Sequence, residues 1–425
     1  MARSALGFSL MAGFAVSQIL FLSEVAGESG NLSPASAESG DESDTGTILL
    51  NIRARYEYGE QAGTDDAEAL TMRARLGYET KDFSGFKLLA ELESTVAVNG
   101  MSGYNGYPGS PQGTPGKIVI ADPRNFELNR AQIAWAGEGT TIIAGRQRII
   151  LNNARFIGNV GWRQNEATFD ALVIRSAVRK DTAFTYAYLD RVNRIFGEKA
   201  DARNQRYWDL STHLFHLETS ALQIGKIGAY AYLLGVDSAG AEGASSNSFG
   251  VFYDGRHGCG ENCTVTTYAE FARQSDNSHN TTGFDLNYLH LVIGAKAGKV
   301  NCGAGYELLD GNGERGFSAP LATGHKFNGW ADEFLGTPAT GLKDLYLWAG
   351  AALPAGFSIK GMGHFFDAEH GVIDYGGELD FLVTKKFDEK WSATAKFARY
   401  YASGEATGAL GRDRTRLSLQ VDFSY

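Results

Sequence analysis

The last nine residues of the chain alternate strictly between apolar and polar side chains. Leu417, Leu419, Val421, Phe423 and Tyr425 carry the apolar positions, and Ser, Gln, Asp and Ser lie between them. Successive side chains of a β-strand point to opposite faces, so this segment presents one face suited to hydrocarbon and one suited to water. The pattern predicts a strand that lies between lipid and water.

Segments with this two-residue period recur from residue 47 to the end, and about eighteen of them can be counted between turn signals. The clearest cover residues 51–58, 71–79, 86–95, 130–135, 185–190, 284–287, 375–381, 391–398 and 416–425. A chain ending on such a strand with a terminal aromatic residue is typical of bacterial outer-membrane barrels, whose last strand pairs with the first. We therefore predict an all-β fold, a closed antiparallel transmembrane β-barrel of about 18 strands.

The connections between these segments alternate in length. Short ones are expected near 81–85, 137–139, 179–181, 219–221, 298–299, 353–356 and 386–390, and mostly longer ones at 59–69, 99–124, 149–167, 192–205, 235–245, 310–342 and 403–413. Connection 256–262 is the longest on the short side. Short turns on one rim and long loops on the other predict periplasmic turns, extracellular loops and periplasmic termini.

Soluble all-β folds are the structural alternatives. A propeller would show a blade-length repeat, and no such period is present. A sandwich also has alternating strands, but apolar sets such as Leu50, Ile52 and Ala54 are too numerous for one shared core. The chain contains Gly 53 times and Pro 8 times, and 12% of its residues are aromatic. This composition fits a fold of many strands joined by tight turns.

The N-terminal region differs from the rest. Arg3 precedes an apolar stretch from Ala5 to Leu22 and the small residues of Val25-Ala26-Gly27, which predicts a signal peptide over 1–27. A single anchoring helix is the alternative. Residues 28–46, rich in Ser, Gly, Glu and Asp, are expected to form a flexible tail before the barrel of 47–425.

The three cysteines suit an exported protein. Cys259 and Cys263 bracket Gly-Glu-Asn in an expected turn, where a disulfide is plausible in the periplasm. Zinc bound with His257 is the rival, although a fourth ligand is lacking. Cys302 then has no cysteine left to pair with. No cofactor is expected.

Placing the polar face of each strand inward gives a list of lumen residues. The early strands contribute Arg53, Arg55, Arg73, Arg75, Arg130, Arg146, Arg148 and Arg175, whereas acids such as Glu270, Glu378 and Asp380 lie on later strands. Charges inside a low-dielectric wall must be paired or hydrated, so we expect a water-filled lumen whose arginines favour anions. Alternatively, the charges neutralise one another across strands.

Several short motifs stand out between residues 124 and 170: Asn129-Arg130-Ala131-Gln132, Ala144-Gly145-Arg146-Gln147, Arg155-Phe156-Ile157-Gly158, Trp162-Arg163-Gln164-Asn165 and Phe169-Asp170. Together with the stretch 324–332, they resemble the alginate export family of outer-membrane porins. The resemblance implies an eighteen-stranded barrel in which Arg130, Arg146, Arg155, Arg163 and Asp170 are constriction residues. One member of that family passes an anionic uronate polymer, but membership alone does not fix the substrate.

The connection 149–167 also supports a constriction, on physical grounds that do not depend on the family resemblance. It is too long for a tight turn and carries Arg155 and Arg163, so it can fold inward and narrow a pore. A surface loop whose arginines meet solvent or lipopolysaccharide phosphates is the alternative.

The functional hypothesis is a porin of the Gram-negative outer membrane, monomeric or weakly associating, that passes polar, anionic solutes or oligosaccharides through an arginine-lined constriction. Its expected partners are outer-membrane lipid and lipopolysaccharide, the barrel assembly machinery and the solute; the net charge of -10 disfavours nucleic acid. An export conduit for a uronate polymer and an adhesive barrel with a blocked lumen remain open. An enzyme is not expected, because no spacing singles out Ser403, Asp367, His364 or His370.

Overall fold

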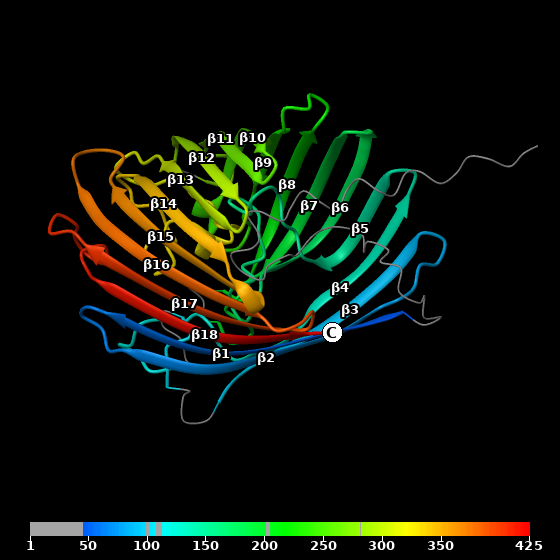
Figure 1. Ribbon diagram of the computed structural model, residues 1–425. Coiled ribbons are helices and arrows are strands. Elements are labelled where there is room, and N and C mark those ends of the chain that lie inside the picture. Colours follow the sequence, from blue (N-terminus) through cyan, green and yellow to red (C-terminus); the bar gives the residue numbers. More distant parts are fainter. Residues whose placement is uncertain (1–45, 99–102, 108–112, 201–204, 281) are drawn as a thin grey trace, which may run out of the picture.

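The barrel is a single closed sheet (Figure 1). The computed structural model describes residues 46–98, 103–107, 113–200, 205–280 and 282–425, so the expected signal peptide and most of the expected tail lie outside the described residues. Eighteen strands pair antiparallel with their neighbours in the sequence, and β1 pairs with both β2 and β18. The prediction of a closed antiparallel barrel of about 18 strands is confirmed.

The strand bounds are as follows: β1 Thr47–Gln61, β2 Ala67–Glu79, β3 Phe86–Ala97, β4 Asn125–Gly137, β5 Thr140–Gln147, β6 Thr168–Arg179, β7 Thr182–Asn193, β8 Tyr207–Thr219, β9 Lys226–Leu234, β10 Ser246–Gly260, β11 Cys263–Ser275, β12 Asp285–Ala297, β13 Val300–Leu309, β14 Leu342–Ala352, β15 Phe357–Asp367, β16 Asp374–Lys386, β17 Trp391–Ala402 and β18 Arg414–Ser424. Single 3-10 turns lie at η1 Glu242–Ala244, η2 Gly324–Lys326 and η3 Pro354–Gly356. Among the described residues, none of the helices is long and apolar enough to cross a membrane.

Closure depends on the pairing of the first strand with the last. The register of β1 and β18 runs from Asn51 opposite Ser424 to Gln61 opposite Arg414. The terminal residue takes part, because the Tyr425 amide donates to the Leu50 carbonyl at 2.9 Å. The alternating C-terminal segment is therefore the strand that seals the wall.

The two faces of the wall differ as the alternation predicts. On the outer face, Leu76, Ile293 and Phe381 have exposed fractions of 56%, 57% and 53%. On the inner face, Arg55 and Asp380 are 1% and 0% exposed. Apolar side chains thus cover the outside, and charged side chains lie inside.

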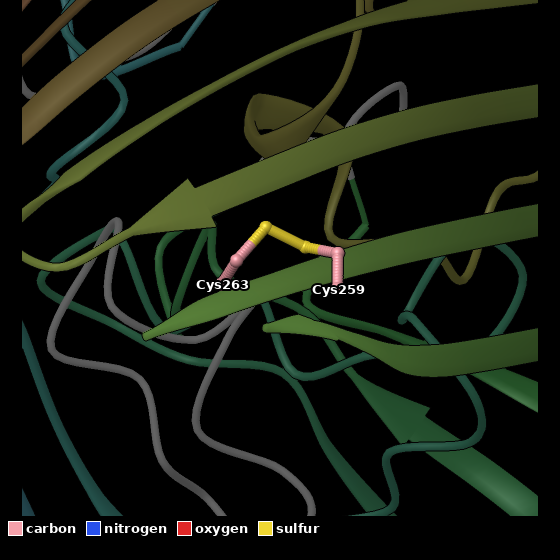
Figure 2. The surroundings of a disulfide bond; sticks show 2 residues. All are labelled: Cys259 and Cys263. Atoms are coloured by element: carbon pink, nitrogen blue, oxygen red, sulfur yellow. A yellow bond between two sulfur atoms is a disulfide. The ribbon is translucent and has the colours of Figure 1, made fainter. Parts of the chain in front are cut away.

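Two expected connections differ from the structure. The connection predicted at 59–69 shortens to residues 62–66, because β1 and β2 extend their ladder to Gly59 opposite Ala67. The turn predicted at 256–262 shortens to residues 261–262, since the glycines of this stretch stay in extended backbone opposite β11. Cys259, the last residue but one of β10, and Cys263, the first residue of β11, form a disulfide with their Cα atoms 5.0 Å apart (Figure 2).

Glycines on the inner face make room for aromatic rings of the neighbouring strand. Gly305 on β13 lies opposite Tyr346 on β14. A Cβ atom at residue 305 would lie 2.1 Å from the ring carbon Cζ of Tyr346. The ring can lie flat against the wall only because residue 305 has no side chain.

We predict that Gly305→Val lowers the stability of the barrel by about 1–3 kcal/mol, since the added side chain displaces the Tyr346 ring from a packed position. Urea unfolding in detergent, followed by tryptophan fluorescence, measures the change. Gly243→Ala is the matched control, because nothing lies within 4 Å of a Cβ atom at that position. Equal effects of the two substitutions would contradict this packing role.

Candidate pore constriction

Three long connections fold into the barrel. They are the described residues 103–107 and 113–124 of the connection between β3 and β4, called the 98–124 loop below, residues 148–167 between β5 and β6, and residues 310–341 between β13 and β14. Each carries side chains that are almost fully buried, including Ile120, Trp162 and Trp330 with exposed fractions of 0%, 5% and 4%. The interior at this level is therefore packed by loop side chains.

The connection 148–167, called the arginine loop below, is held in the interior by ion pairs. Arg163 bridges two elements, since its guanidinium binds Glu57 of β1 at 3.1 Å and Asp332 of the 310–341 loop at 2.6 Å. Arg155 binds Glu307 of β13 at 2.8 Å. The inward course that the sequence predicts for this loop agrees with these contacts.

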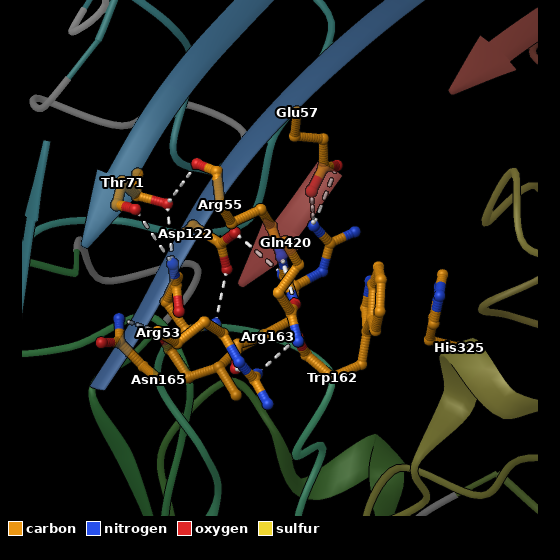
Figure 3. Close-up of polar contacts among 12 residues, drawn as sticks. Arg53, Arg55, Glu57, Thr71, Asp122, Trp162, Arg163, Asn165, His325 and Gln420 are labelled. Atoms are coloured by element: carbon orange, nitrogen blue, oxygen red, sulfur yellow. Dashed lines mark hydrogen bonds and ion pairs between the residues drawn. The ribbon is translucent and has the colours of Figure 1, made fainter. Parts of the chain in front are cut away.

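Trp162 of the arginine loop lies beside the His325 ring (Figure 3) and contacts two cationic side chains. The guanidinium carbon of Arg55 lies 4.1 Å from the centroid of the indole ring, and the Lys396 ammonium lies 3.5 Å from it. The His325 ring stacks on the same indole at 4.8 Å, with 8° between the ring planes. Cation–π contacts of this kind are stronger where water is excluded.

A small cavity remains where the arginine loop meets the 310–341 loop and the wall. It is lined by Glu57, Trp162, His325, Trp330, Lys396, Ala398, Arg416 and Ser418. Both aromatic faces and charged groups line this meeting point of wall and loops. We take it, together with the arginines described next, as the candidate constriction.

The hydrogen bonds of His325 define its protonation state. Lysine only donates, so the 2.9 Å contact from the Lys396 ammonium makes Nε2 an acceptor. The hydrogen is then on Nδ1, which donates to Asp332 at 2.6 Å. Burial lowers the pKa of His325 to about 3, because the charged ring would be desolvated and would face Lys396.

Asp332 is the anionic centre of this contact. Burial alone would raise its pKa, but His325 and then Arg163 outweigh burial and hold the pKa of Asp332 below its usual range. The carboxylate therefore stays ionised and joins the two loops.

A second ionic network lies on the wall of β2 to β5. Arg75 binds Glu93 at 2.5 Å, and Arg130 binds Glu91 at 2.7 Å. Arg148 binds both Glu91 and the arginine-loop residue Glu166, at 3.2 and 2.5 Å. Arg130 and Arg148 keep side-chain exposures of 15% and 22%, so their guanidinium groups still reach the lumen.

The arginines of β1 anchor the inward loops. Arg53 binds Asp422 of β18 at 2.7 Å and donates to the Gly161 carbonyl at 3.0 Å. Arg55 binds Asp122 of the 98–124 loop at 3.2 Å. These two predicted site residues lie in the lumen, where they position loops.

Arg146 and Asp170 face the opposite way, so the structure does not bring them together with the arginines that contact the inward loops. They bind each other at 2.7 Å from directly opposite positions on β5 and β6. The adjacent pair in this ladder, Gln147 and Phe169, is buried on the inner face, so the alternation of a strand places Arg146 and Asp170 on the outer face, the face of Leu172. The sequence prediction assigned every polar strand residue to the lumen. Near a strand end, however, two polar residues of opposite charge can pair with each other on the outer face, as Arg146 and Asp170 do.

Arg175 is the remaining predicted residue. Its partner in the register, Thr185, is buried on the inner face, so Arg175 also points inward. It lies near the short-turn end of β6, binds Glu218 at 3.1 Å and has a side-chain exposure of 47%. It therefore lines the short-turn mouth, away from the loops.

The half of the barrel formed by β7 to β13 is filled by aromatic side chains. Tyr230 and Tyr268 donate to Glu270 at 2.8 and 2.7 Å, and Phe156 of the arginine loop packs on Tyr288 at 5.5 Å. Tyrosine hydroxyl groups satisfy the Glu270 carboxylate here, so the arginine-bearing wall is the more polar side of the lumen.

Several residues of this site are absent from the predicted list. Asp122, Trp162, Glu166, Asp332 and Lys396 hold the loops together. Trp162 and Asp332 lie within the stretches that carry the family resemblance, and that resemblance was the one feature of the sequence that could have identified them as site residues. Their partners lie up to 234 residues away in sequence, and spacing along the chain does not reveal such pairs.

One cluster could hold a metal ion among the residues that the structure describes. Asp310, Glu369 and His370 bring ligand atoms within 4.8 Å of one another. His370 already binds both carboxylates, at 3.2 and 2.7 Å. His257 instead contacts the Tyr253 hydroxyl at 2.9 Å, and the two cysteines beside it are bonded to each other.

The fold is shared with solved outer-membrane porins. OccAB4 of Acinetobacter baumannii is 12% identical with a TM-score of 0.69, covering 91% of this chain and 100% of that chain. OpdQ of Pseudomonas aeruginosa is 12% identical with a TM-score of 0.66, covering 90% and 99%. OpdK of Pseudomonas aeruginosa, solved with vanillate, is 12% identical with a TM-score of 0.66, covering 89% and 99%.

No protein-family model and no curated protein sequence matches the chain. At 12% identity the structural likeness shows the fold alone. It supports the porin fold in general and not the alginate export family in particular.

We predict that His325 makes stability depend on pH. The unfolded chain takes up a proton at residue 325 below about pH 6.5, whereas the folded protein does so only near pH 3. The stabilising contribution is therefore complete above pH 6.5 and falls by about 1.4 kcal/mol per pH unit below it. Urea unfolding at pH 7.5, 6.5, 5.5 and 4.5 measures this slope.

The variant His325→Gln cannot titrate and should show a shallower slope than the wild type between pH 6.5 and 4.5. His257→Gln, on the exposed hairpin tip, serves as the control and should keep the wild-type slope. Parallel slopes for wild type and His325→Gln would show that His325 is not neutral in the folded protein.

Proposed function

We propose that the protein is a channel of the Gram-negative outer membrane that passes polar, anionic solutes along the arginine-bearing wall. The observation that carries this proposal is the placement of Arg130 and Arg148, which reach the lumen beside an inward loop. Guanidinium groups attract anions by local potential and bind carboxylates in a bidentate way. The opposite half of the barrel is packed by aromatic side chains, which directs a solute to this wall.

The shared fold supports the same location and solute class. OpdK, which has this fold, was solved with vanillate, and vanillate is an aromatic carboxylate. The candidate constriction offers the matching groups, since Trp162 and Trp330 present aromatic faces beside Lys396 and Arg416. Lipid and lipopolysaccharide would surround the outer face, and the barrel assembly machinery would insert the chain.

Export of an anionic uronate polymer is the second candidate. It rests on the resemblance of residues 124–170 to the alginate export family. The two functions differ in how bilayer currents respond to added solutes: a uronate oligosaccharide should block a polymer conduit at lower concentration than benzoate, and the reverse is expected for a channel for small carboxylates. An adhesive barrel with a blocked lumen, which the packed loops favour, would conduct no ions.

We predict that Arg148→Gln shifts the selectivity of the channel toward cations. One unit charge about 6 Å from an ion path in water changes the energy of an ion by about 0.7 kcal/mol, with opposite signs for an anion and a cation. The permeability ratio of the two ions therefore changes by about 1.4 kcal/mol, or about tenfold. The zero-current potential of purified protein in a planar bilayer under a KCl gradient measures this ratio.

Arg146→Gln is the matched control. Arg146 lies two residues away and has a nearly equal side-chain exposure, 19% against 22%, but the strand register places it on the outer face. It should leave the potential unchanged. Equal shifts for both variants, or none for Arg148→Gln, would contradict the assignment of the solute path to this wall.

A further inference from the structure

Three side chains of metal-binding types converge at the long-loop rim, outside the candidate constriction. Asp310 follows the last residue of β13, and Glu369 and His370 lie in the connection between β15 and β16. Each residue offers one ligand atom, and these atoms all lie within 4.8 Å of one another. The side chain of His370 is 57% exposed. A dissolved ion on the long-loop side of the barrel can therefore reach the cluster.

The ligand atoms are spaced like the ligands of a single ion. The Nε2 atom of His370 lies 3.2 Å from Asp310 Oδ1 and 2.7 Å from Glu369 Oε2. In a tetrahedral zinc site with ligands about 2.0–2.1 Å from the metal, neighbouring ligand atoms lie about 3.3 Å apart. Both distances are close to this separation, so small side-chain rotations bring the three atoms onto one ion.

Glu369 has a carboxylate oxygen that no hydrogen bond satisfies. Its Oε2 atom is buried and has no hydrogen-bond partner among the described residues, because the 2.7 Å contact with His370 lacks hydrogen-bond geometry. A buried oxygen in this state calls for a positively charged partner. Asp310 is held in position, since the Gly311 amide donates to its Oδ1 atom at 2.8 Å and the Asn287 amide to its Oδ2 atom at 3.1 Å. The cluster is therefore partly preorganised, with one acceptor left open.

The ligand types select the class of ion. Calcium and magnesium prefer sites made of oxygen ligands alone, whereas imidazole together with carboxylates suits zinc and neighbouring transition metals. Three protein ligands also leave a fourth position to water, as in zinc sites that stay open to solvent. Two carboxylates balance the charge of a divalent ion when His370 binds as the neutral imidazole. The cluster therefore fits a divalent transition-metal ion of the zinc class.

The cluster lies at the neck of the 310–341 loop, which begins at one of the three ligands. The His370 amide donates to the Thr340 carbonyl at 2.9 Å. Gly341 packs closely on Glu369, because a Cβ atom at residue 341 would lie 2.5 Å from the Glu369 Cβ atom. An ion in the cluster would therefore join the start of the loop to a connection that already contacts its end.

We propose that Asp310, Glu369 and His370 bind one divalent transition-metal ion of the zinc class, and that the bound ion clamps the neck of the 310–341 loop. Trp330 of this loop lines the candidate constriction. An external ion thus restrains one side of the pore. The inference goes beyond the proposed function, because binding of the ion does not depend on which solute the barrel passes.

Zinc titration of the untagged protein in detergent tests the site. The background is Cys302→Ser, because an exposed thiol also binds zinc. By calorimetry this parent should bind one Zn²⁺ per chain, and a large excess of Ca²⁺ should not displace it. His370→Gln should weaken zinc binding by at least about tenfold, since even the loss of an outer partner of a metal ligand has an effect of that size.

His279→Gln is the matched control. His279 lies in the connection between β11 and β12 on the same rim, with a side-chain exposure of 37%. Its Nε2 atom contacts a single carboxylate, that of Asp237, at 3.3 Å. A histidine beside one acid does not complete a zinc site, so this variant should bind zinc like the parent.

Hydrogen exchange tests the clamp without relying on transport. The Gly313 amide donates to the Ala339 carbonyl at 2.8 Å and the Gly341 amide to the Pro338 carbonyl at 2.9 Å, so both amides report opening of the neck. Zinc at about ten times its dissociation constant should slow their exchange about tenfold in the parent, because an opened neck no longer holds the ion. At the same zinc concentration, His370→Gln should show little change.

The outcomes separate the metal site, the clamp and the channel. Equal zinc affinities for the parent and His370→Gln, or weaker binding by His279→Gln, overturn the site. Displacement of zinc by an equal concentration of calcium overturns the class of ion. Zinc binding without slower exchange overturns the clamp. Each result stands whatever Arg148→Gln does to ion selectivity, so failure of the metal site is distinguishable from failure of the proposed function.

Discussion

The pairing of β1 with β18 is the constraint on which the remaining structure depends. A bilayer core offers no water to backbone amides and carbonyls, so a sheet can cross it only if it has no free edge. The ladder from Asn51 opposite Ser424 to Gln61 opposite Arg414 removes that edge. A closed barrel of eighteen strands also encloses a wide interior, and this interior provides the space into which the long loops fold.

The interior is organised by charge pairs that join the loops to the wall. Arg163 holds Glu57 of the wall and Asp332 of the second loop with one guanidinium group, and Arg55 holds Asp122 of the third. Such pairs are stabilising only when both partners are present, since loss of one partner leaves a buried charge at a cost of about 3–5 kcal/mol. The three loops are therefore coupled, and a displacement of one exposes charges of the others.

Much of the fold could be predicted from the sequence because alternation with a period of two is a local property. The C-terminal strand and the inward position of Arg53 and Arg55 both follow from it. The inward course of the arginine loop was predicted instead from its length and its two arginines. The site was less predictable. The sequence prediction placed Arg146 in the lumen because the residue is polar, but Arg146 binds Asp170 at the opposite position of the neighbouring strand, on the outer face. Bonds such as Arg163 to Asp332 join residues that are 169 positions apart, and no local pattern encodes them.

The two halves of the barrel interior are filled by different kinds of side chain, so the lumen is polar on one side and aromatic on the other. From β7 to β13, tyrosines fill the lumen and donate their hydroxyl groups to Glu270 and Glu307, so these acids are satisfied without cations from a solute. On the other wall, Glu91 is shared by Arg130 and Arg148, and cationic donors remain turned toward the lumen. The proposed anion path rests on this difference, since the acids of one half are satisfied by protein donors while arginines of the other half stay partly exposed, although the whole chain carries a net charge of -10. The selectivity of a channel follows the charges that line its path, and these are the charges that the packing leaves accessible.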